Sequence, residues 1–163
     1  MKTTIPLLAD KFYHIYNRGN NAELIFYRDE DYERFLRKHI KYCCPVVNTY
    51  AYCLMNNHFH FLVRIRSHPE PSDLSETVFH TDVSRQFAHL FNSHAQYINK
   101  HYDRTGSLFE KPFKRLPIDN ENYFIEVLKY IHWNPQFHHS KIVFDEYPFS
   151  SYDRYLSSDS SRF

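Results

Sequence analysis

Near its middle the chain reads Met55-Asn56-Asn57-His58-Phe59-His60-Phe61-Leu62-Val63, a turn signal followed by a run with a bulky apolar side chain at every second position from Phe59. Asparagine pairs are typical of tight turns, and successive side chains on a strand point to opposite faces. The alternation therefore predicts a strand over residues 58–65. It also predicts two unlike faces, an apolar one with Phe59, Phe61, Val63 and Ile65 and another with His58, His60, Leu62 and Arg64.

Six further elements are predicted around this strand from β-forming runs, helical spacing and breaking residues. The strands cover about 12–17, 46–55 and 108–109 with 113–118, the last an edge or bulged strand at Pro112. The helices cover about 29–43, 83–102 and 120–133, the last capped by Asp119-Asn120 and ended by Pro135. The order β-α-β-β-α-β-α predicts an α+β fold of the ferredoxin-like, or RRM-like, split β-α-β type. We expect a four- to five-stranded antiparallel sheet with two helices on one face and the last helix on the other.

The length and composition fit one domain. With 163 residues the chain can bury a proper core, and we expect a single domain over 1–163, with its core at about 11–137, a packed tail at 138–163 and a long loop at 66–80. A net charge of +1 does not by itself indicate a nucleic-acid binder. Three cysteines make no disulfide framework, and we find neither a signal peptide nor a membrane-length apolar stretch. We therefore expect a reduced, cytoplasmic protein with no membrane partner.

His58 and His60 fall on one face of the predicted strand, where two imidazoles can share one metal ion. In a chain with twelve histidines, such a pair is equally compatible with a structural or surface role. The common zinc motifs fit no better, because the chain has neither Cys-x-x-Cys nor His-Glu-x-x-His. The two histidines are therefore candidate metal ligands.

The last predicted helix carries a second polar set, with Tyr123, Glu126, Tyr130 and Asn134 beside its core stripe. Tyr130 and Asn134 lie one turn apart, so a phenol and an amide oxygen can point the same way. Each has a plain alternative, since a tyrosine commonly packs half-buried and Asn134 can cap the helix end before Pro135. Two imidazoles, an amide oxygen and water would suit Mg²⁺ or Mn²⁺ as well as a softer metal ion.

Taken together and in this order, the motifs resemble a known family. His58-Phe59-His60 looks like the histidine–hydrophobic–histidine (HUH) signature. Tyr130-Ile131-His132-Trp133-Asn134-Pro135 looks like the Tyr-Ile-x-x-Asn-Pro signature of single-tyrosine HUH transposases, and the closest group is the REP-associated tyrosine transposases, which are insertion-sequence-like enzymes. Further similar stretches extend the resemblance over about 11–155: Phe12-Tyr13-His14-Ile15, Asn17-Arg18-Gly19-Asn20-Asn21, Phe91-Asn92, Tyr97-Ile98-Asn99, Gly106-Ser107-Leu108-Phe109 and Ser150-Ser151-Tyr152. The chain departs from the family at Asn56, often proline there, and at Glu110-Lys111-Pro112, where Gln-Gly-Arg is commoner.

The resemblance implies a metal-dependent DNA transposase, a single-strand endonuclease and strand transferase. Carried over residue by residue, it makes His58, His60 and Asn134 the ligands of Mg²⁺ or Mn²⁺ and Tyr130 the nucleophile. A phenol is a weak nucleophile at neutral pH, so it needs a phosphate activated by a metal ion. Attack by Tyr130 leaves a 5′-phosphotyrosine link and a free 3′-hydroxyl, and another 3′-hydroxyl can reverse the step without ATP.

Single-stranded or hairpin DNA, such as a REP-like palindrome, is the implied partner, because this attack needs an accessible, unpaired backbone. The candidate DNA contacts are polar or basic side chains from a loop beside Gly19 and from a locally basic segment: Arg18, Asn20, Asn21, Arg104, Lys111, Lys114 and Arg115. An ordinary solvated surface explains the same charges. The sequence leaves open whether a homodimer forms and whether Tyr130 meets the histidines of its own chain or those of a partner.

Two other functions stay open at this point. Ferredoxin-like sheets commonly bind single-stranded DNA or RNA without cutting it, so the chain can be a non-cleaving, domesticated binding module. A metal phosphodiesterase that uses water would leave Tyr130 as a packing residue.

Overall fold

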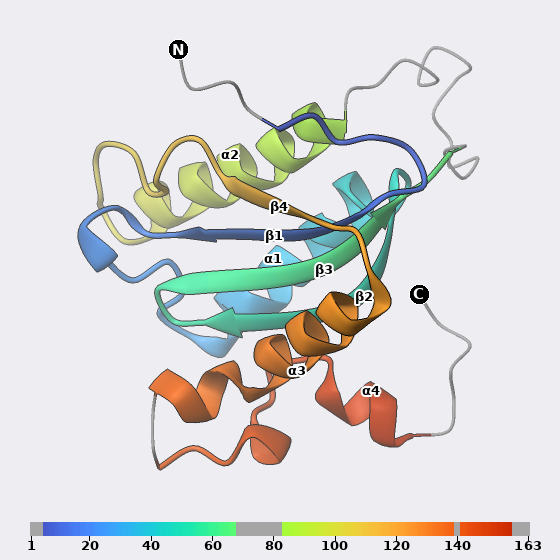
Figure 1. The fold of residues 1–163 in the computed structure, drawn as a ribbon. Coiled ribbons are helices and arrows are strands. Elements are labelled where there is room, and N and C mark those ends of the chain that lie inside the picture. Colours follow the sequence, from blue (N-terminus) through green and yellow to red (C-terminus); the bar gives the residue numbers. More distant parts are fainter. Residues whose placement is uncertain (1–4, 68–82, 139–140, 158–163) are drawn as a thin grey trace.

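The computed structural model describes residues 5–67, 83–138 and 141–157. Its main elements are, in order, β1 (Phe12–Arg18), α1 (Asp29–Tyr42), β2 (Val47–Met55), β3 (His58–Ile65), α2 (Val83–His101), β4 (Lys114–Ile118) and α3 (Glu121–His138). Three short helices accompany them: η1 (Asn20–Ala22), η3 (Phe144–Glu146) and α4 (Tyr152–Leu156). The predicted β-α-β-β-α-β-α order is confirmed (Figure 1).

The four strands form one antiparallel sheet in the order β2-β3-β1-β4. This is the split β-α-β order, in which each helical connection returns the chain with one strand left between, and it confirms the predicted fold class. β4 lies at an edge and pairs only with β1. Pro117 is tolerated within β4 because an edge strand has no second neighbour that needs its missing N–H.

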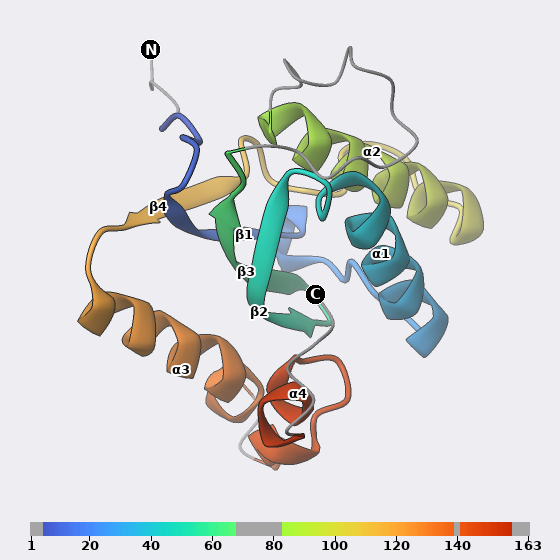
Figure 2. The same cartoon turned by 90° about the vertical axis from the view of Figure 1, so that its right-hand side faces the viewer.

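Different helices cover the two faces of the sheet, α1 and α2 on one and α3 on the other (Figure 2). In the larger core, Phe59 and Phe61 of β3 pack with Phe35 of α1. In the smaller core, Leu62 of β3 lies with Ile131 of α3. The predicted division of β3 into two unlike faces is therefore confirmed, and the histidine face is the one beneath α3.

The helix α3 begins as predicted and ends later than predicted. Asn120 Oδ1 accepts a hydrogen bond from the backbone N–H of Tyr123 at 2.8 Å, which caps the first turn. The prediction that Pro135 ends the helix is wrong, because the helix continues to His138. Proline removes one helical hydrogen bond, but its fixed φ is itself helical, so the chain can continue beyond it. Asn134 thus lies inside the helix and is not its C-terminal cap.

The C-terminal segment lies along the outer edge of β2. The backbone N–H of Leu54 donates to the carbonyl of Phe149 at 2.9 Å, and that of Ser151 donates to the carbonyl of Tyr52 at 3.0 Å. Most of the predicted 66–80 loop, and positions 139–140 and 158–163 of the predicted tail, lie outside the described residues. Within the described ranges, no helix combines the length and the apolar character needed to cross a bilayer.

Candidate active site

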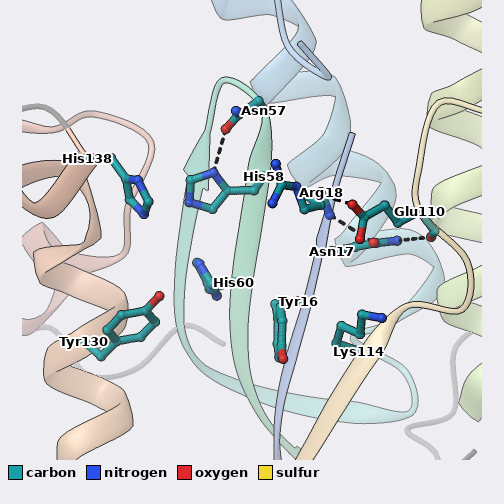
Figure 3. A pocket seen from close by; sticks show the side chains of 10 residues that line it. All are labelled: Tyr16, Asn17, Arg18, Asn57, His58, His60, Glu110, Lys114, Tyr130 and His138. Atoms are coloured by element: carbon teal, nitrogen blue, oxygen red, sulfur yellow. Dashed lines mark hydrogen bonds and ion pairs between the residues drawn. The ribbon is translucent and has the colours of Figure 1, made fainter. Parts of the chain in front are cut away.

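Two adjacent strands and one helix bring the candidate residues together. His58 and His60 lie on the α3 face of β3, and the sheet register places Tyr16 of β1 directly opposite His60. The helix α3 crosses this face, and Figure 3 shows Tyr130 turned toward the two imidazoles. Asn134, one turn further along α3, contacts both histidines.

An open cavity of about 370 Å³ lies where these elements meet. We call it the histidine cavity. Its lining side chains come from β1, the β2–β3 turn, β3, the segment before β4, β4 itself and α3: Tyr16, Asn17, Arg18, Asn57, His58, His60, Glu110, Lys114, Tyr130 and His138 (Figure 3). Of the sequence-predicted catalytic set, Tyr130, His58 and His60 therefore share one accessible space. Asn134 does not line it but is fully buried in contact with both histidines.

His58 presents each ring nitrogen to an amide oxygen. Its Nδ1 lies 2.7 Å from Asn57 Oδ1, and its Nε2 lies 2.9 Å from Asn134 Oδ1. A neutral imidazole carries one N–H, so it can donate in only one of these two contacts. The other contact then brings two lone pairs together, an arrangement that a bound cation would relieve.

His60 is buried at 6% exposure and held from both sides. Its Nδ1 lies 2.9 Å from His14 Nε2, and its Nε2 lies 3.4 Å from Asn134 Nδ2. Burial first, and then the nearby imidazoles of other histidines, hold the pKa of His60 well below its usual value. His60 is therefore neutral at pH 7, with one ring nitrogen protonated and a lone pair on the other.

The donor set fits a hard divalent cation. Among the described residues, no group of three or more His, Cys, Asp or Glu side chains is arranged to hold a metal ion. A metal ion held by His58 and His60 would therefore take a further protein ligand of another kind, such as the amide of Asn134. His58 Nε2 and Asn134 Oδ1 lie 2.9 Å apart. Ligands at right angles around a Mg²⁺ ion, about 2.1 Å from it, lie about 3.0 Å from each other. The observed 2.9 Å is the length of an ordinary hydrogen bond, and it is also close to the spacing of two adjacent ligands of one ion.

Tyr130 stands at the mouth of the histidine cavity with 41% of its surface exposed. Its ring lies edge-on to His60, with 5.4 Å between the ring centroids, and Phe137 stacks beside it at 6.2 Å. Tyr123, the neighbouring tyrosine of α3, is not among the residues that line the cavity. Tyr16 does line it, but burial, and after that the nearby phenols, raise the pKa of Tyr16. Tyr130 thus lines the histidine cavity, whereas Tyr123 lines a neighbouring cavity of about 370 Å³ that also includes His60 and Tyr130.

Two of the predicted DNA contacts lie on the wall opposite Tyr130. The side chains of Arg18 and Lys114 line the cavity there (Figure 3). Arg18 Nε forms an ion pair with Glu110 Oε1 at 3.5 Å, and both side chains are partly exposed. Such an exposed pair is weak, so a phosphate can compete for the guanidinium.

Three other predicted contacts lie in η1, shortly after Arg18 in the chain, or pair with the residue that follows η1. Asn20 Nδ2 donates to the carbonyl of Ser107 at 2.9 Å, while Asn21 is exposed with a φ of 52°. Arg104 is held by an ion pair with Glu23.

The last two predicted contacts lie further from the histidines. Lys111 is exposed and lines a second cavity of about 380 Å³ beside α2. The structure does not bring Arg115 to the histidine cavity. Its side chain is buried on the other face, where it donates to Ser84 Oγ at 2.7 Å and lies over the ring of Phe113. Arg115 therefore acts within the core packing.

Sequence reasoning missed six residues of this site: His14, Tyr16, Asn17, Asn57, Glu110 and His138. The alternation of β1 puts His14 and Tyr16 on one face, but only the register with β3 shows that this is the histidine face. His138 lies one turn beyond Asn134, a helical spacing that the predicted end at Pro135 concealed. Its ring centroid is 4.6 Å from that of His58.

No family model matches the chain, and a comparison with curated proteins also found no match. Among solved structures, the chain is similar to a REP-associated tyrosine transposase bound to a REP hairpin. The two share a fold. Their TM-score is 0.66 over 97% of this chain and 86% of that one, at 16% sequence identity. The likeness supports the fold-level relationship, and the roles of individual residues rest on the geometry above.

Proposed function

We propose that this chain is a DNA strand transferase of the single-tyrosine HUH type, which cuts and rejoins single-stranded or hairpin DNA. One observation carries the proposal: Tyr130, His58 and His60 line one open cavity across from Arg18 and Lys114, and Asn134 contacts both histidines. The likeness in fold to a transposase bound to a REP hairpin supports the same class of substrate.

In this proposal Tyr130 is the nucleophile. Its oxygen forms a bond to phosphorus while its proton leaves to solvent, and the bond from phosphorus to the 3′-oxygen breaks. The departing oxygen takes up a proton and becomes a free 3′-hydroxyl. One phosphodiester bond replaces another, so no ATP is consumed and another 3′-hydroxyl can reverse the reaction.

The proposed metal ligands are His58 Nε2, His60 Nε2 and Asn134 Oδ1. A divalent ion bound there, Mg²⁺ or Mn²⁺, supplies positive charge to the phosphate oxygens in the transition state. The protein's own groups prepare the site: Asn57 fixes the ring of His58, and the helical position of Asn134 aims its amide between the two histidines.

We propose that the DNA backbone passes between Tyr130 and the wall that carries Arg18 and Lys114. Both cations lie across the cavity from the phenol, so they can hold phosphates on either side of the bond that is cut. Asn20, Asn21, Arg104 and Lys111 extend this surface beyond the cavity. Their contacts would add affinity or base reading without taking part in the chemistry.

The test uses a hairpin oligonucleotide with an unpaired flank, labelled at its 3′ end, and Mn²⁺. Because the 5′-phosphate stays on the tyrosine, the label should travel with the protein on a denaturing gel. We expect Tyr130→Phe to reduce this adduct at least about a thousandfold, since the nucleophile is gone. The variant should still fold, and its affinity for the DNA should stay within about threefold of the unaltered chain, because the side chain of Tyr130 is exposed.

Tyr123→Phe is the matched control on the same helix and should keep the adduct. Loss of the adduct in this variant but not in Tyr130→Phe would assign the wrong tyrosine. Binding with no cleavage by the unaltered chain would instead support a non-cleaving binding module. Cleavage without an adduct, surviving in Tyr130→Phe, would support a phosphodiesterase that uses water.

A further inference from the structure

We propose that His14 is a positioning residue that keeps the proton of the His60 ring on Nδ1, so that Nε2 stays unprotonated and faces Asn134. The proposal deepens the proposed function and rests on it in one respect, the use of His60 Nε2 as a metal ligand. The position of the proton itself can be measured without metal or DNA.

The imidazole rings of His14 and His60 are in direct contact. His14 lies on β1, diagonally across from His60, since its direct partner in the register is Leu62. His14 Nε2 and His60 Nδ1 are 2.9 Å apart, and both side chains are 6% exposed. At this distance, shielded from water, one nitrogen must donate and the other accept.

The amide of Asn134 sets the direction of that hydrogen bond. On the far side of the His60 ring, the Nδ2 group of Asn134 lies 3.4 Å from Nε2, and an amide NH₂ can only donate. Nε2 is therefore the acceptor, and the proton of a neutral His60 is on Nδ1. His14 Nε2 must then accept it, which places the proton of His14 on its own Nδ1.

The side chain that faces His60 in the register does not make the hydrogen-bond contact that His14 makes. Tyr16 lies directly opposite His60, but its ring is beside the imidazole, with centroids 5.7 Å apart. The hydrogen-bond contact at His60 Nδ1 is made by His14 Nε2, which in this proposal is the acceptor. In metal sites the nitrogen that does not bind the ion is generally held this way, which fixes both the tautomer and the ring orientation.

The first experiment reads the tautomer by long-range ¹H–¹⁵N correlation on metal-free, ¹⁵N-labelled protein at about pH 7. A His60→Gln spectrum assigns the signals. We expect the Nδ1–H form of His60 in the unaltered chain and a shift toward Nε2–H in His14→Phe, which fills the space without accepting a hydrogen bond. His14→Gln should retain the Nδ1–H form, because its amide oxygen can accept. Finding Nε2–H in the unaltered chain, or no change in His14→Phe, would overturn the proposal.

The second experiment measures Mn²⁺ affinity by electron paramagnetic resonance of the free ion, with no DNA present. Loss of a group that holds a metal ligand typically weakens metal binding about 10- to 100-fold, and we expect this for His14→Phe and most of the affinity back for His14→Gln. His132→Phe is the matched control, since His132 is equally buried but bonds Ser151 Oγ on the other side of α3. It should bind Mn²⁺ normally.

Equal Mn²⁺ affinity in His14→Phe and the unaltered chain would contradict the positioning role. If His14→Phe does not fold, His14→Ala replaces it, since alanine also cannot accept the hydrogen bond. If the unaltered chain shows no Mn²⁺ binding that His58→Ala abolishes, the metal site of the proposed function is wrong. The tautomer spectrum then still decides what His14 does.

Discussion

His58 is the residue at which the site is easiest to probe. Its ring is only partly buried, and both of its nitrogens face amide oxygens, of Asn57 and of Asn134. His60 is buried and held by His14, so a change there disturbs packing as well. A change at His58 therefore reports on the ligand set with the least effect on the fold.

We predict that His58→Ala weakens Mn²⁺ binding by more than about 100-fold, because a direct ligand matters at least as much as the groups that support it. The DNA adduct should fall below detection. The free energy of unfolding should change by about 1 kcal/mol or less, as is usual away from the core. Titration with Mn²⁺ and urea denaturation measure the two effects, and His89→Ala, an exposed histidine of α2, is the control. Unfolding of His58→Ala, or Mn²⁺ binding that persists in it, would contradict this placement.

Among the elements, β3 separates chemistry from packing. Phe59 and Phe61 point into the core under α1, while His58 and His60 point to α3. The larger core also buries a histidine of α1. His39 stacks on Phe61, with 4.2 Å between the ring centroids, and its Nε2 lies 2.9 Å from Thr49 Oγ1. Burial lowers the pKa of His39 to about 3.

This buried histidine makes the free energy of unfolding depend on pH. The unfolded chain binds a proton at His39 below its ordinary pKa of about 6.5, whereas the folded chain stays neutral until much lower pH. The contribution of the neutral His39 ring to the free energy of unfolding is therefore complete above about pH 6.5 and is lost as pH falls toward 3. Between about pH 7 and about pH 5, His39 alone should remove about 2 kcal/mol of stability.

We predict that His39→Gln shows a smaller loss of unfolding free energy over this pH range, by about 2 kcal/mol, whatever its stability at pH 7. Urea denaturation at both pH values measures the difference. The exposed His101→Gln should keep the pH dependence of the unaltered chain. An unchanged pH dependence in His39→Gln would mean that His39 is not held neutral by burial.

The helices and strands also show which features of the fold could be predicted from the sequence and which could not. Side-chain periodicity predicted the element order and the two faces of β3, because both depend on neighbouring residues alone. It could not predict that His14 meets His60, because that contact depends on the register between strands. Alternation along the predicted 113–118 strand does place Lys114 and Arg115 on opposite faces, and the predicted set of DNA contacts overlooked this. The helix beyond Pro135 was missed because proline usually ends a helix.

For the whole molecule, the main finding is that one chain supplies every part of the proposed site. The ring of Tyr130 and the imidazole of His60 lie 5.4 Å apart between centroids, within a single fold. We therefore propose that Tyr130 acts with the histidines of its own chain. No exchange of α3 between subunits is needed to build the site.

This proposal predicts that two inactive variants do not rescue each other. A mixture of Tyr130→Phe and His58→Ala should give no DNA adduct, because neither chain holds both a nucleophile and a complete ligand set. If α3 were exchanged in a homodimer, mixed dimers would contain one intact site. Adduct formation in the mixture, at a sizeable fraction of the unaltered activity, would contradict attack within one chain.

The most direct measurement of the central claim is to locate the attached nucleotide by mass spectrometry after digestion with trypsin. Cleavage at lysine and arginine separates the candidates, with Tyr130 in the peptide 130–141, Tyr123 in 116–129 and Tyr16 in 12–18. We predict that a nucleotide is attached through its 5′-phosphate to Tyr130 alone. This adduct should form only with Mg²⁺ or Mn²⁺ and should be absent from His58→Ala. A nucleotide on Tyr123 or Tyr16, or cleaved DNA with no modified peptide, would contradict the account.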